Sequence, residues 1–267
     1  MLDGLSPARR RFVGAIVVLA LVLAVVGAAA YLLSRPDPVQ PVAQDAAGPV
    51  LLVPGYGGST TGLDVLAAGL RDDGRDVTVV QLAGDGTGDL RTQAKVLDEA
   101  AHQALERTGA ESVDVVGYSA GGIVARVWVA DLGGASIARR VVTLSSPNHG
   151  TQLATLASGL GSTTCPAACQ QLATGSDLLR ALNDGDETPA GPRWVAMWTA
   201  DDATVVPPES GVLDGATSFS VQSVCPGLEV GHTDVPQDPT VLAMVADQLD
   251  RETPGAPDGS VCAAVSP

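Results

Sequence analysis

The run from Gly117 to Gly121 has the residue types needed to present a serine as a nucleophile. It reads Gly-Tyr-Ser-Ala-Gly, follows an apolar run over 113–116 and precedes a helical pattern over 121–132. A serine hydroxyl attacks well when a sharp strand-to-helix turn holds it clear of the backbone, and glycines on either side avoid collisions in that turn. Because five residues of this pattern also arise by chance, the flanking elements and partner residues must support it. We predict that Ser119 is a catalytic nucleophile.

Three histidines in the whole chain are candidates for the base that would take the serine proton. In one large class of serine hydrolases the nucleophile, the acid and the histidine follow each other in that chain order. His232 satisfies this order, since it lies in a loop before the last helical pattern. His102 lies in a helix before the serine and is expected to be solvated. His149 precedes the candidate acids, and we interpret it as a structural or pocket-lining residue.

Two neighbouring carboxylates, Asp201 and Asp202, could orient the histidine and stabilise its protonated ring. Both follow a strand pattern over 194–199 and precede a Val-Val-Pro turn. A carboxylate just past the end of a strand can reach back to a histidine on a neighbouring loop. The order of residues alone does not choose between the two acids.

A glycine-rich loop over 55–58 follows the first strand pattern and suits the binding of an oxyanion. Glycines let a backbone amide approach a substrate oxygen closely. The alternative is a phosphate-binding loop, which requires a Gly-Lys-Ser/Thr ending, and the chain's lone lysine is Lys95. We predict that the backbone amides of Tyr56 and Ala120 form the oxyanion hole.

The elements that must position these residues alternate along the chain. Strand patterns lie at 50–53, 77–81, 113–116, 141–144, 194–199 and 219–224, and helical patterns lie at 63–71, 90–108, 121–132 and 239–250. Strands that alternate with helices predict an α/β fold: a mostly parallel sheet of about six strands with helices on both faces. The alternation breaks at 147–192, which lacks a strand pattern and contains scattered leucines. So long a loop in a compact domain is usually functional.

The first 35 residues have the pattern of a single membrane-spanning helix. Phe12–Leu33 contains 22 residues without a charge and follows the basic residues Arg9, Arg10 and Arg11. A helix of that length is about 33 Å long, enough to cross a hydrocarbon core of about 30 Å. Basic residues before the span keep the N-terminus cytoplasmic. A cleaved secretory signal is the alternative, although its apolar region is usually shorter.

The predicted organisation is therefore a cytoplasmic N-terminus and signal anchor over 1–35, a proline-rich tether over 36–48 and a catalytic domain over 49–267. The catalytic domain would lie outside the cell, either held at the membrane or secreted after cleavage.

The net charge of −15 excludes nucleic acid as a partner, because such a surface repels phosphates.

Four cysteines agree with export. Cys165 and Cys169 are close in sequence, so a local disulfide is plausible, and Cys225 with Cys262 would then tie the C-terminal tail to the segment before the last helix. A metal site is the weaker alternative, because there is no Cys-x-x-Cys pair and histidines are few. We expect no metal and no cofactor.

Several motifs in combination resemble the bacterial triacylglycerol lipases of the class 2 type, within the α/β-hydrolase family. They are Val-Pro-Gly-Tyr-Gly-Gly, Gly-Tyr-Ser-Ala-Gly-Gly, Ser-Ser-Pro-Asn-His-Gly-Thr, Gly-Ser-Asp-Leu-Leu-Arg-Ala-Leu-Asn, Asp-Asp-Ala-Thr-Val-Val-Pro-Pro and Gly-His-Thr-Asp, spread over about 48–250. The family's Asp-x-x-Val spacing favours Asp202, with Val205, as the acid. Pro54 departs from the family, which commonly has histidine there. The resemblance implies that 147–192 is a lid or pocket wall, although its leucines are equally explained by packing.

The leading hypothesis is hydrolysis of lipid or small acyl esters through an acyl-enzyme on Ser119, by a monomer. Acyl transfer to an alcohol of the cell envelope would use the same residues and differs only in what deacylates the enzyme. A catalytically idle binding module on the same fold is the alternative from another class.

Overall fold

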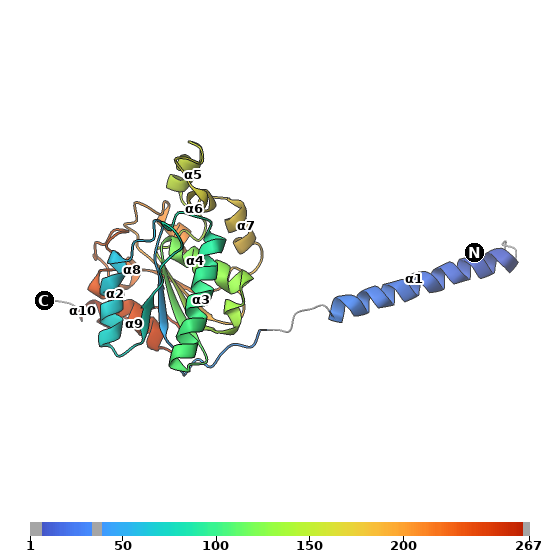
Figure 1. Ribbon diagram of the computed structural model, residues 1–267, viewed down its shortest axis with the longest axis horizontal. Coiled ribbons are helices and arrows are strands. Elements are labelled where there is room, and N and C mark those ends of the chain that lie inside the picture. Colours follow the sequence, from blue (N-terminus) through green and yellow to red (C-terminus); the bar gives the residue numbers. More distant parts are fainter. Residues whose placement is uncertain (1–6, 34–38, 264–267) are drawn as a thin grey trace. The chain divides into compact units, whose positions relative to one another are not determined.

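The computed structural model describes residues 7–33 and 39–263, and its larger unit is built on a single parallel sheet (Figure 1). The strands run in the order β2-β1-β3-β4-β5-β6, and every neighbouring pair is parallel. Their bounds are β1 Val50–Val53, β2 Val77–Val79, β3 Val113–Tyr118, β4 Ala138–Leu144, β5 Arg193–Trp198 and β6 Thr217–Ser220. The predicted six-stranded parallel sheet is confirmed.

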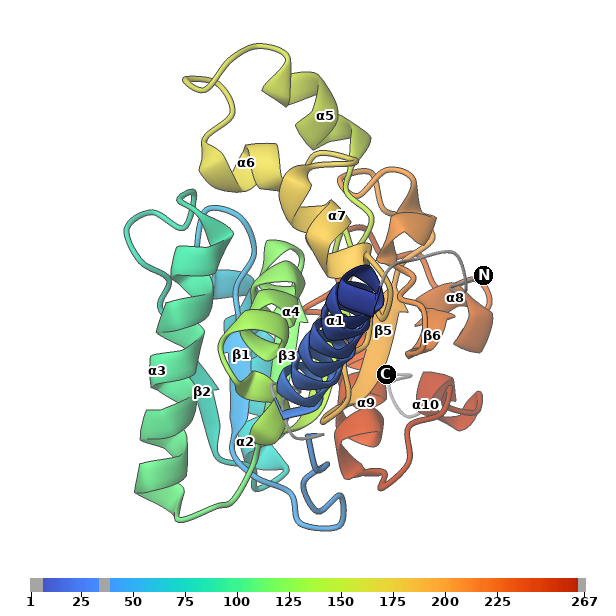
Figure 2. The same ribbon diagram turned by 90° about the vertical axis from the view of Figure 1, so that its right-hand side faces the viewer.

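Helices cover both faces of this sheet because its strands bury side chains on both sides (Figure 2). Leu51 of β1 packs in the same core as α3 (Leu90–Thr108) and α4 (Ala120–Asp131), whereas Leu52 packs in the core formed with α2 (Thr61–Asp72) and α9 (Pro239–Asp250). Alternation along a strand sends successive residues to opposite faces. This explains why the strands read as continuous apolar runs.

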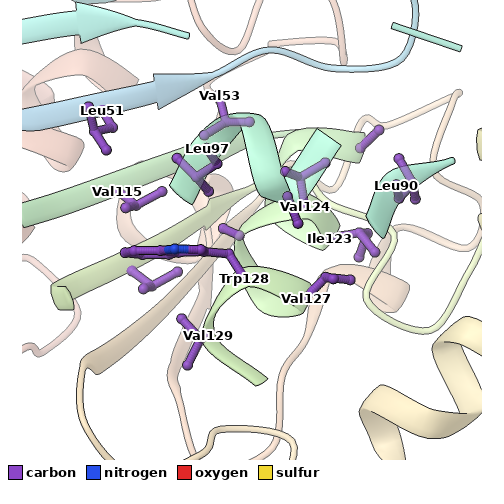
Figure 3. Close-up of a cluster of buried hydrophobic side chains, with 14 of the residues drawn as sticks. Leu51, Val53, Leu90, Leu97, Val115, Ile123, Val124, Val127, Trp128 and Val129 are labelled. Carbon is purple, nitrogen blue, oxygen red and sulfur yellow. The ribbon is translucent and has the colours of Figure 1, made fainter. Parts of the chain in front are cut away.

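Helix α4 forms the centre of one core, and its position fixes the serine that precedes it. Trp128, Ile123 and Val124 of α4 are fully buried, and they belong to one cluster with Leu97 of α3 and with residues of the strands (Figure 3). Deleting a large buried side chain such as tryptophan typically costs about 3–5 kcal/mol. The packing therefore holds the first turn of α4 firmly against the sheet.

The remaining helices are short and lie mostly at the ends of the strands. They are α5 Gln152–Ser158, α6 Ala167–Gln171, α7 Asp177–Asn183, α8 Val221–Val224 and α10 Ser260–Ala263, with 3-10 turns η1 at Gly134–Ser136 and η2 at Pro208–Gly211. The predicted last strand, 219–224, is wrong in its last four residues, which form the helical turn α8. The side chain of Ser220 accepts a hydrogen bond from the Ser223 amide and so starts a helix there.

The two predicted disulfides are both present. Cys165 is bonded to Cys169, and Cys225 to Cys262. The second bond ties α10, near the C-terminus, to the residue that follows α8. Disulfides persist in oxidising compartments. Together with the apolar N-terminal helix, they indicate a membrane-anchored or secreted protein.

Helix α1, Pro7–Leu33, forms a separate unit of the chain that ends at residue 38. Among the described residues, its stretch Arg11–Ala29 is the one helix long and apolar enough to cross a membrane, a property that an N-terminal signal sequence shares. Arg35, Pro36 and Pro38 lie outside the described residues. The later part of the expected tether, 39–48, belongs to the larger unit, and Arg139 donates a 3.1 Å hydrogen bond to the carbonyl of Gln44.

A fully buried ion pair lies at the amino end of the sheet. Asp114 of β3 accepts a 2.9 Å hydrogen bond from Nε of Arg139 and a second from its Nη2, and both side chains are shielded from solvent. The same Arg139 Nη2 also donates to the carbonyl of Leu249 at the end of α9, at 2.8 Å. This pair joins β3, β4 and α9. Removal of one partner would leave an uncompensated charge in the interior.

We therefore expect Asp114→Asn to lower the free energy of unfolding by about 3–5 kcal/mol. The matched control is Asp76→Asn, which breaks the pair of Asp76 with Arg107, both about half exposed; exposed pairs contribute at most ~1 kcal/mol. Thermal unfolding followed by tryptophan fluorescence compares the two variants in one detergent. Equal destabilisation would contradict a special role for the buried pair.

Candidate active site

Ser119 lies on the sharp turn between β3 and α4 that its sequence predicts. Its φ is +51°, a value that non-glycine residues rarely adopt. Glycines make the turn possible: a Cβ on Gly121 would overlap the carbonyl of Val53, and one on Gly117 would overlap the backbone of Gly121. The buried packing of α4 maintains this strained conformation. The turn places the hydroxyl at the carboxyl end of the sheet.

The structure brings Ser119, His232 and Asp202 together from three separate loops. Nε2 of His232 lies 3.0 Å from Oγ of Ser119, and Nδ1 lies 2.7 Å from Oδ2 of Asp202. His232 and Asp202 are buried, with 8% and 6% of their surfaces exposed. These are hydrogen-bond distances for a base that accepts the serine proton and an acid that fixes the ring's tautomer.

The structure places Asp202, and not Asp201, against the histidine. Oδ1 of Asp202 accepts hydrogen bonds from the amides of Thr204 (2.8 Å) and Val205 (2.7 Å), which leaves Oδ2 free to face the ring. The Asp-x-x-Val spacing thus has a physical basis, because the carboxylate caps the turn that contains the valine. The exposed Asp201 accepts instead from the amide of Val230, at 3.3 Å.

A residue that the sequence reading missed, Gln222, joins the loop of the acid to the loop of the histidine. Its Nε2 lies 2.9 Å from Oγ1 of Thr199 and 3.1 Å from Oδ2 of Asp201, and its Oε1 accepts from the amide of Ala200 at 2.9 Å. Thr199 in turn donates to the carbonyl of Val230, two residues before the histidine, at 2.6 Å. No sequence motif points to this glutamine, because its partners come from distant segments.

We expect Gln222→Met to lower kcat roughly 10- to 100-fold with little change in KM, because the two loops would lose their common partner and shift the histidine. Gln237→Met is the matched control, since Gln237 is exposed and bonds only the carbonyl of Thr233. Steady-state kinetics and melting temperature are measured for both. A fall in melting temperature that accounts for the lost activity would contradict the positioning role.

Tyr118 contacts both the backbone and the ring of His232. Its hydroxyl donates a 2.9 Å hydrogen bond to the carbonyl of His232, and the two rings lie 5.2 Å apart. Burial, together with the negative charges of Asp202 and Asp234, raises the pKa of Tyr118 above its ordinary value. The phenol therefore stays protonated and keeps donating throughout the working pH range.

The two amides predicted for the oxyanion hole belong to segments that meet at Ser119. Ala120 is the first residue of α4, where backbone N–H groups point out of the helix end. In the loop after β1, a Cβ on Gly55 would lie 3.1 Å from Cβ of Ser119, so this loop passes directly beside the serine. Tyr56 is the next residue. The role of the two amides stays a prediction.

An apolar cavity of about 320 Å³ opens at Ser119. Four of its twelve lining residues come from the loops at Tyr56, Ser119 and Asp202, and eight come from the segment 147–192. They are Tyr56, Ser119, Pro147, Thr151, Leu153, Ala154, Ala157, Thr164, Cys169, Leu172, Thr204 and Val205. None of them carries a charge. A larger cavity of about 670 Å³ lies beside α7 and contains none of the three aligned residues.

The other two histidines lie apart from this arrangement. His149 bonds Oε1 of Glu187 at 2.9 Å and lines the larger cavity. His102 is exposed, with Nε2 3.7 Å from a carboxylate oxygen of Asp98.

Among the described residues, no group of three or more acidic, histidine or cysteine side chains could hold a metal ion.

A buried arginine of α4, Arg126, holds the segment after Pro147 in place. It donates to the carbonyl of Asn148 (3.2 Å), the carbonyl of Leu182 (3.0 Å) and Oδ1 of Asn183 (2.7 Å). Burial lowers the pKa of Arg126 to about 10, so the guanidinium remains charged at neutral pH. The helix behind the serine thus also supports the wall of the cavity.

The parallel sheet, the helices on both its faces and the turn at Ser119 have the arrangement of the α/β-hydrolase fold. Residues 101–225 match the model of the family described as lipase (class 2). This match spans slightly less than half of the chain, and it confirms the resemblance predicted from the motifs.

Solved structures of low identity share the fold. Aspergillus fumigatus lipase B has 18% identity and a TM-score of 0.65, with 83% of this chain and 59% of that chain covered. Mature Bacillus licheniformis lipase BlEst2 has 20% identity and a TM-score of 0.56, with 76% and 89% covered. An α/β-hydrolase enzyme from a Moroccan lagoon-sediment metagenome has 15% identity and a TM-score of 0.52, with 76% and 90% covered. The chain thus spans about three-fifths of the fungal lipase.

Proposed function

We propose that this protein hydrolyses lipid-like carboxylic esters through an acyl-enzyme on Ser119, with His232 as base and Asp202 as its acid partner. The observation that carries the proposal is the continuous chain of hydrogen bonds from Asp202 through His232 to Ser119, beside an uncharged cavity. Nucleophile, base and orienting acid in hydrogen-bond reach are the parts that acyl transfer needs.

The geometry supports a two-step reaction. Oγ of Ser119 attacks the ester carbonyl while Nε2 of His232 takes its proton, and the same proton then passes to the departing alcohol. The negative oxygen of the tetrahedral intermediate would accept from the amides of Tyr56 and Ala120. Water, deprotonated by His232, then attacks the acyl-enzyme and releases the acid. Asp202 stabilises the charged imidazole in both steps.

The surroundings of the cavity favour a lipid-like substrate. No Asp, Glu, Lys or Arg occurs between Arg140 and Asp177, although the chain as a whole has a net charge of −15. Leu156 and Leu160 in this stretch are 71% and 73% exposed. Apolar side chains this exposed usually mark a surface of interaction. We assign the segment 147–192 as the wall of the pocket, whose outward leucines meet the acyl chains of a lipid aggregate.

We also propose that α1 remains as a membrane anchor, with the catalytic domain on the outer side. The support is the length of the apolar stretch, the arginines before it and the two disulfides. Extraction of membranes at alkaline pH and N-terminal sequencing test this. Full-length protein in the membrane pellet is expected, whereas a new N-terminus after the alanines at 28–30 would show a cleaved signal.

The test of the activity uses the full chain in a mild detergent, a fluorophosphonate probe and p-nitrophenyl octanoate. The probe is expected to label Ser119, as mapped by mass spectrometry, and to block release of nitrophenolate in proportion to labelling. Heat-denatured protein is the control and should not be labelled. Activity that survives complete labelling would contradict the proposed nucleophile.

The same assay separates hydrolysis from transfer. Hydrolysis yields one free octanoate for each nitrophenolate, whether or not an alcohol such as glycerol is added. If glycerol takes most of the octanoyl groups as ester at low concentration, the reaction is acyl transfer and the proposal of hydrolysis is wrong.

A further inference from the structure

The cavity at Ser119 has a defined outer end, which is formed by helix α5 and the disulfide-linked turn before α6. The start of α5 is fixed to the loop of the acid, because Oγ1 of Thr151 donates to the carbonyl of Thr204 at 2.7 Å and the amide of Gln152 donates to Val206 at 2.9 Å. From there α5 runs beyond the carboxyl ends of the strands (Figure 2). Ala157 lies six residues after Thr151, or about 9 Å along the helix.

The residues at this outer end are small, and one of them is held by a disulfide bond. Ala157, Thr164 and Cys169 all line the cavity, and Cys169 is bonded to the fully buried Cys165. The amide of Thr174 also donates to Oγ1 of Thr155 at 2.9 Å, which joins α5 to the segment after α6. The wall is therefore tied at three places and is built to keep its shape.

The volume of the cavity limits what it holds. Its 320 Å³ is near the lower end of the range for small-molecule sites, about 300–1,000 Å³. At ~30 Å³ for each group the size of a water molecule, it holds about ten such groups. One acyl chain of medium length fills this volume, while a chain of sixteen carbons would extend beyond it. The alcohol part of the ester would remain outside the cavity.

We infer that the enzyme selects esters of medium-chain acids, of roughly six to ten carbons, and that Ala157 and Leu153 of α5 set the length. This inference rests on the proposed function, because the cavity is an acyl site only if Ser119 is the nucleophile. Ala157 leaves the outer space open to the chain. Leu153, which is half exposed at the near part of α5, narrows it.

The experiment measures kcat/KM of the full chain for p-nitrophenyl butyrate, octanoate and palmitate at one fixed detergent concentration. In the wild-type protein, kcat/KM for octanoate is expected to exceed kcat/KM for palmitate at least tenfold. Ala157→Leu should lower octanoate turnover roughly 10-fold or more, since a misfit of a methylene or two in an apolar pocket has this effect. Butyrate turnover should change less than about threefold, because a short chain does not reach Ala157.

Two further variants keep the result interpretable. Leu153→Ala enlarges the cavity and should raise kcat/KM for palmitate relative to that for octanoate. Simple destabilisation of the fold does not produce such a gain. Ala68→Leu adds the same bulk at an exposed position of α2 and should leave all three ratios unchanged. If Ala157→Leu lowers all three esters equally, or the wild-type protein prefers palmitate, the inference is wrong.

The outcomes also separate this inference from the proposed function. Butyrate hydrolysis that requires Ser119 but shows no dependence on chain length would overturn only the selection by length. No hydrolysis of any of the three esters by the wild-type protein would overturn the proposed function itself.

Discussion

Ser119→Ala is expected to lower kcat for p-nitrophenyl octanoate by roughly 10⁶-fold, the loss seen when a serine nucleophile is removed from a triad. The physical reason is that no other group lies in position to form the acyl-enzyme, while Nε2 of His232 loses the hydroxyl 3.0 Å away. A residual rate above that in water would come from the oxyanion donors and from binding.

The first control for this prediction is the melting temperature of the Ser119→Ala variant, which shows whether its fold is intact. Alanine at a φ of +51° is as strained as serine, so the melting temperature should stay within a few degrees of the wild-type value. Ser146→Ala is a matched substitution, since Ser146 is a buried serine whose hydroxyl donates to the carbonyl of Gly117 at 3.3 Å. A similar loss of activity in both variants would contradict a unique role for Ser119.

Asp202→Asn is the second large effect, with an expected fall in kcat of roughly 10⁴-fold. The asparagine can still accept from the amides of Thr204 and Val205, so the turn should keep its shape. Its amide group, however, would face Nδ1 of His232 as a donor and favour the wrong tautomer of the ring. The stabilisation of the charged imidazole is lost as well.

The neighbouring acid provides the matched control. Asp201→Asn keeps an oxygen that can accept from the Val230 amide, so only about 1 kcal/mol, or roughly fivefold in rate, should be lost. Kinetics of both variants with octanoate at saturating concentration decide the assignment. Losses of the same size would mean that the two acids share the role, and a larger loss in Asp201→Asn would reverse it.

Local patterns in the sequence were sufficient for much of the fold. Leu51 and Leu52 can be placed in a strand because apolar residues continue without interruption, which predicts burial on both faces. The strand predicted at 219–224 is wrong after Ser220, because apolar periodicity over a few residues does not distinguish a strand from a helical turn. There the hydrogen bond from the Ser223 amide to the Ser220 side chain decided the conformation.

In the candidate site, too, local features could be predicted from the sequence and contacts between distant segments could not. The turn at Ser119 could be predicted because it is local: the glycines at 117 and 121 and the serine between them lie within five residues of the chain. Gln222, Tyr118 and Arg126 could not be predicted, because each acts on segments that lie far from it in the sequence. No motif identifies the roles of these side chains, and several of their partners are backbone carbonyls, which any sequence supplies.

The sequence by itself determined the apolar N-terminal helix, the alternation that builds a parallel sheet, the proximity of Cys165 to Cys169 and the order of serine, acid and histidine. These depend on composition and on spacing along the chain. Tertiary structure alone decided that Asp202 faces His232, that Gln222 joins their loops, and that α5 lines a cavity of 320 Å³. The reason is physical: these features depend on distances between loops, which only the packing of helices against the sheet fixes.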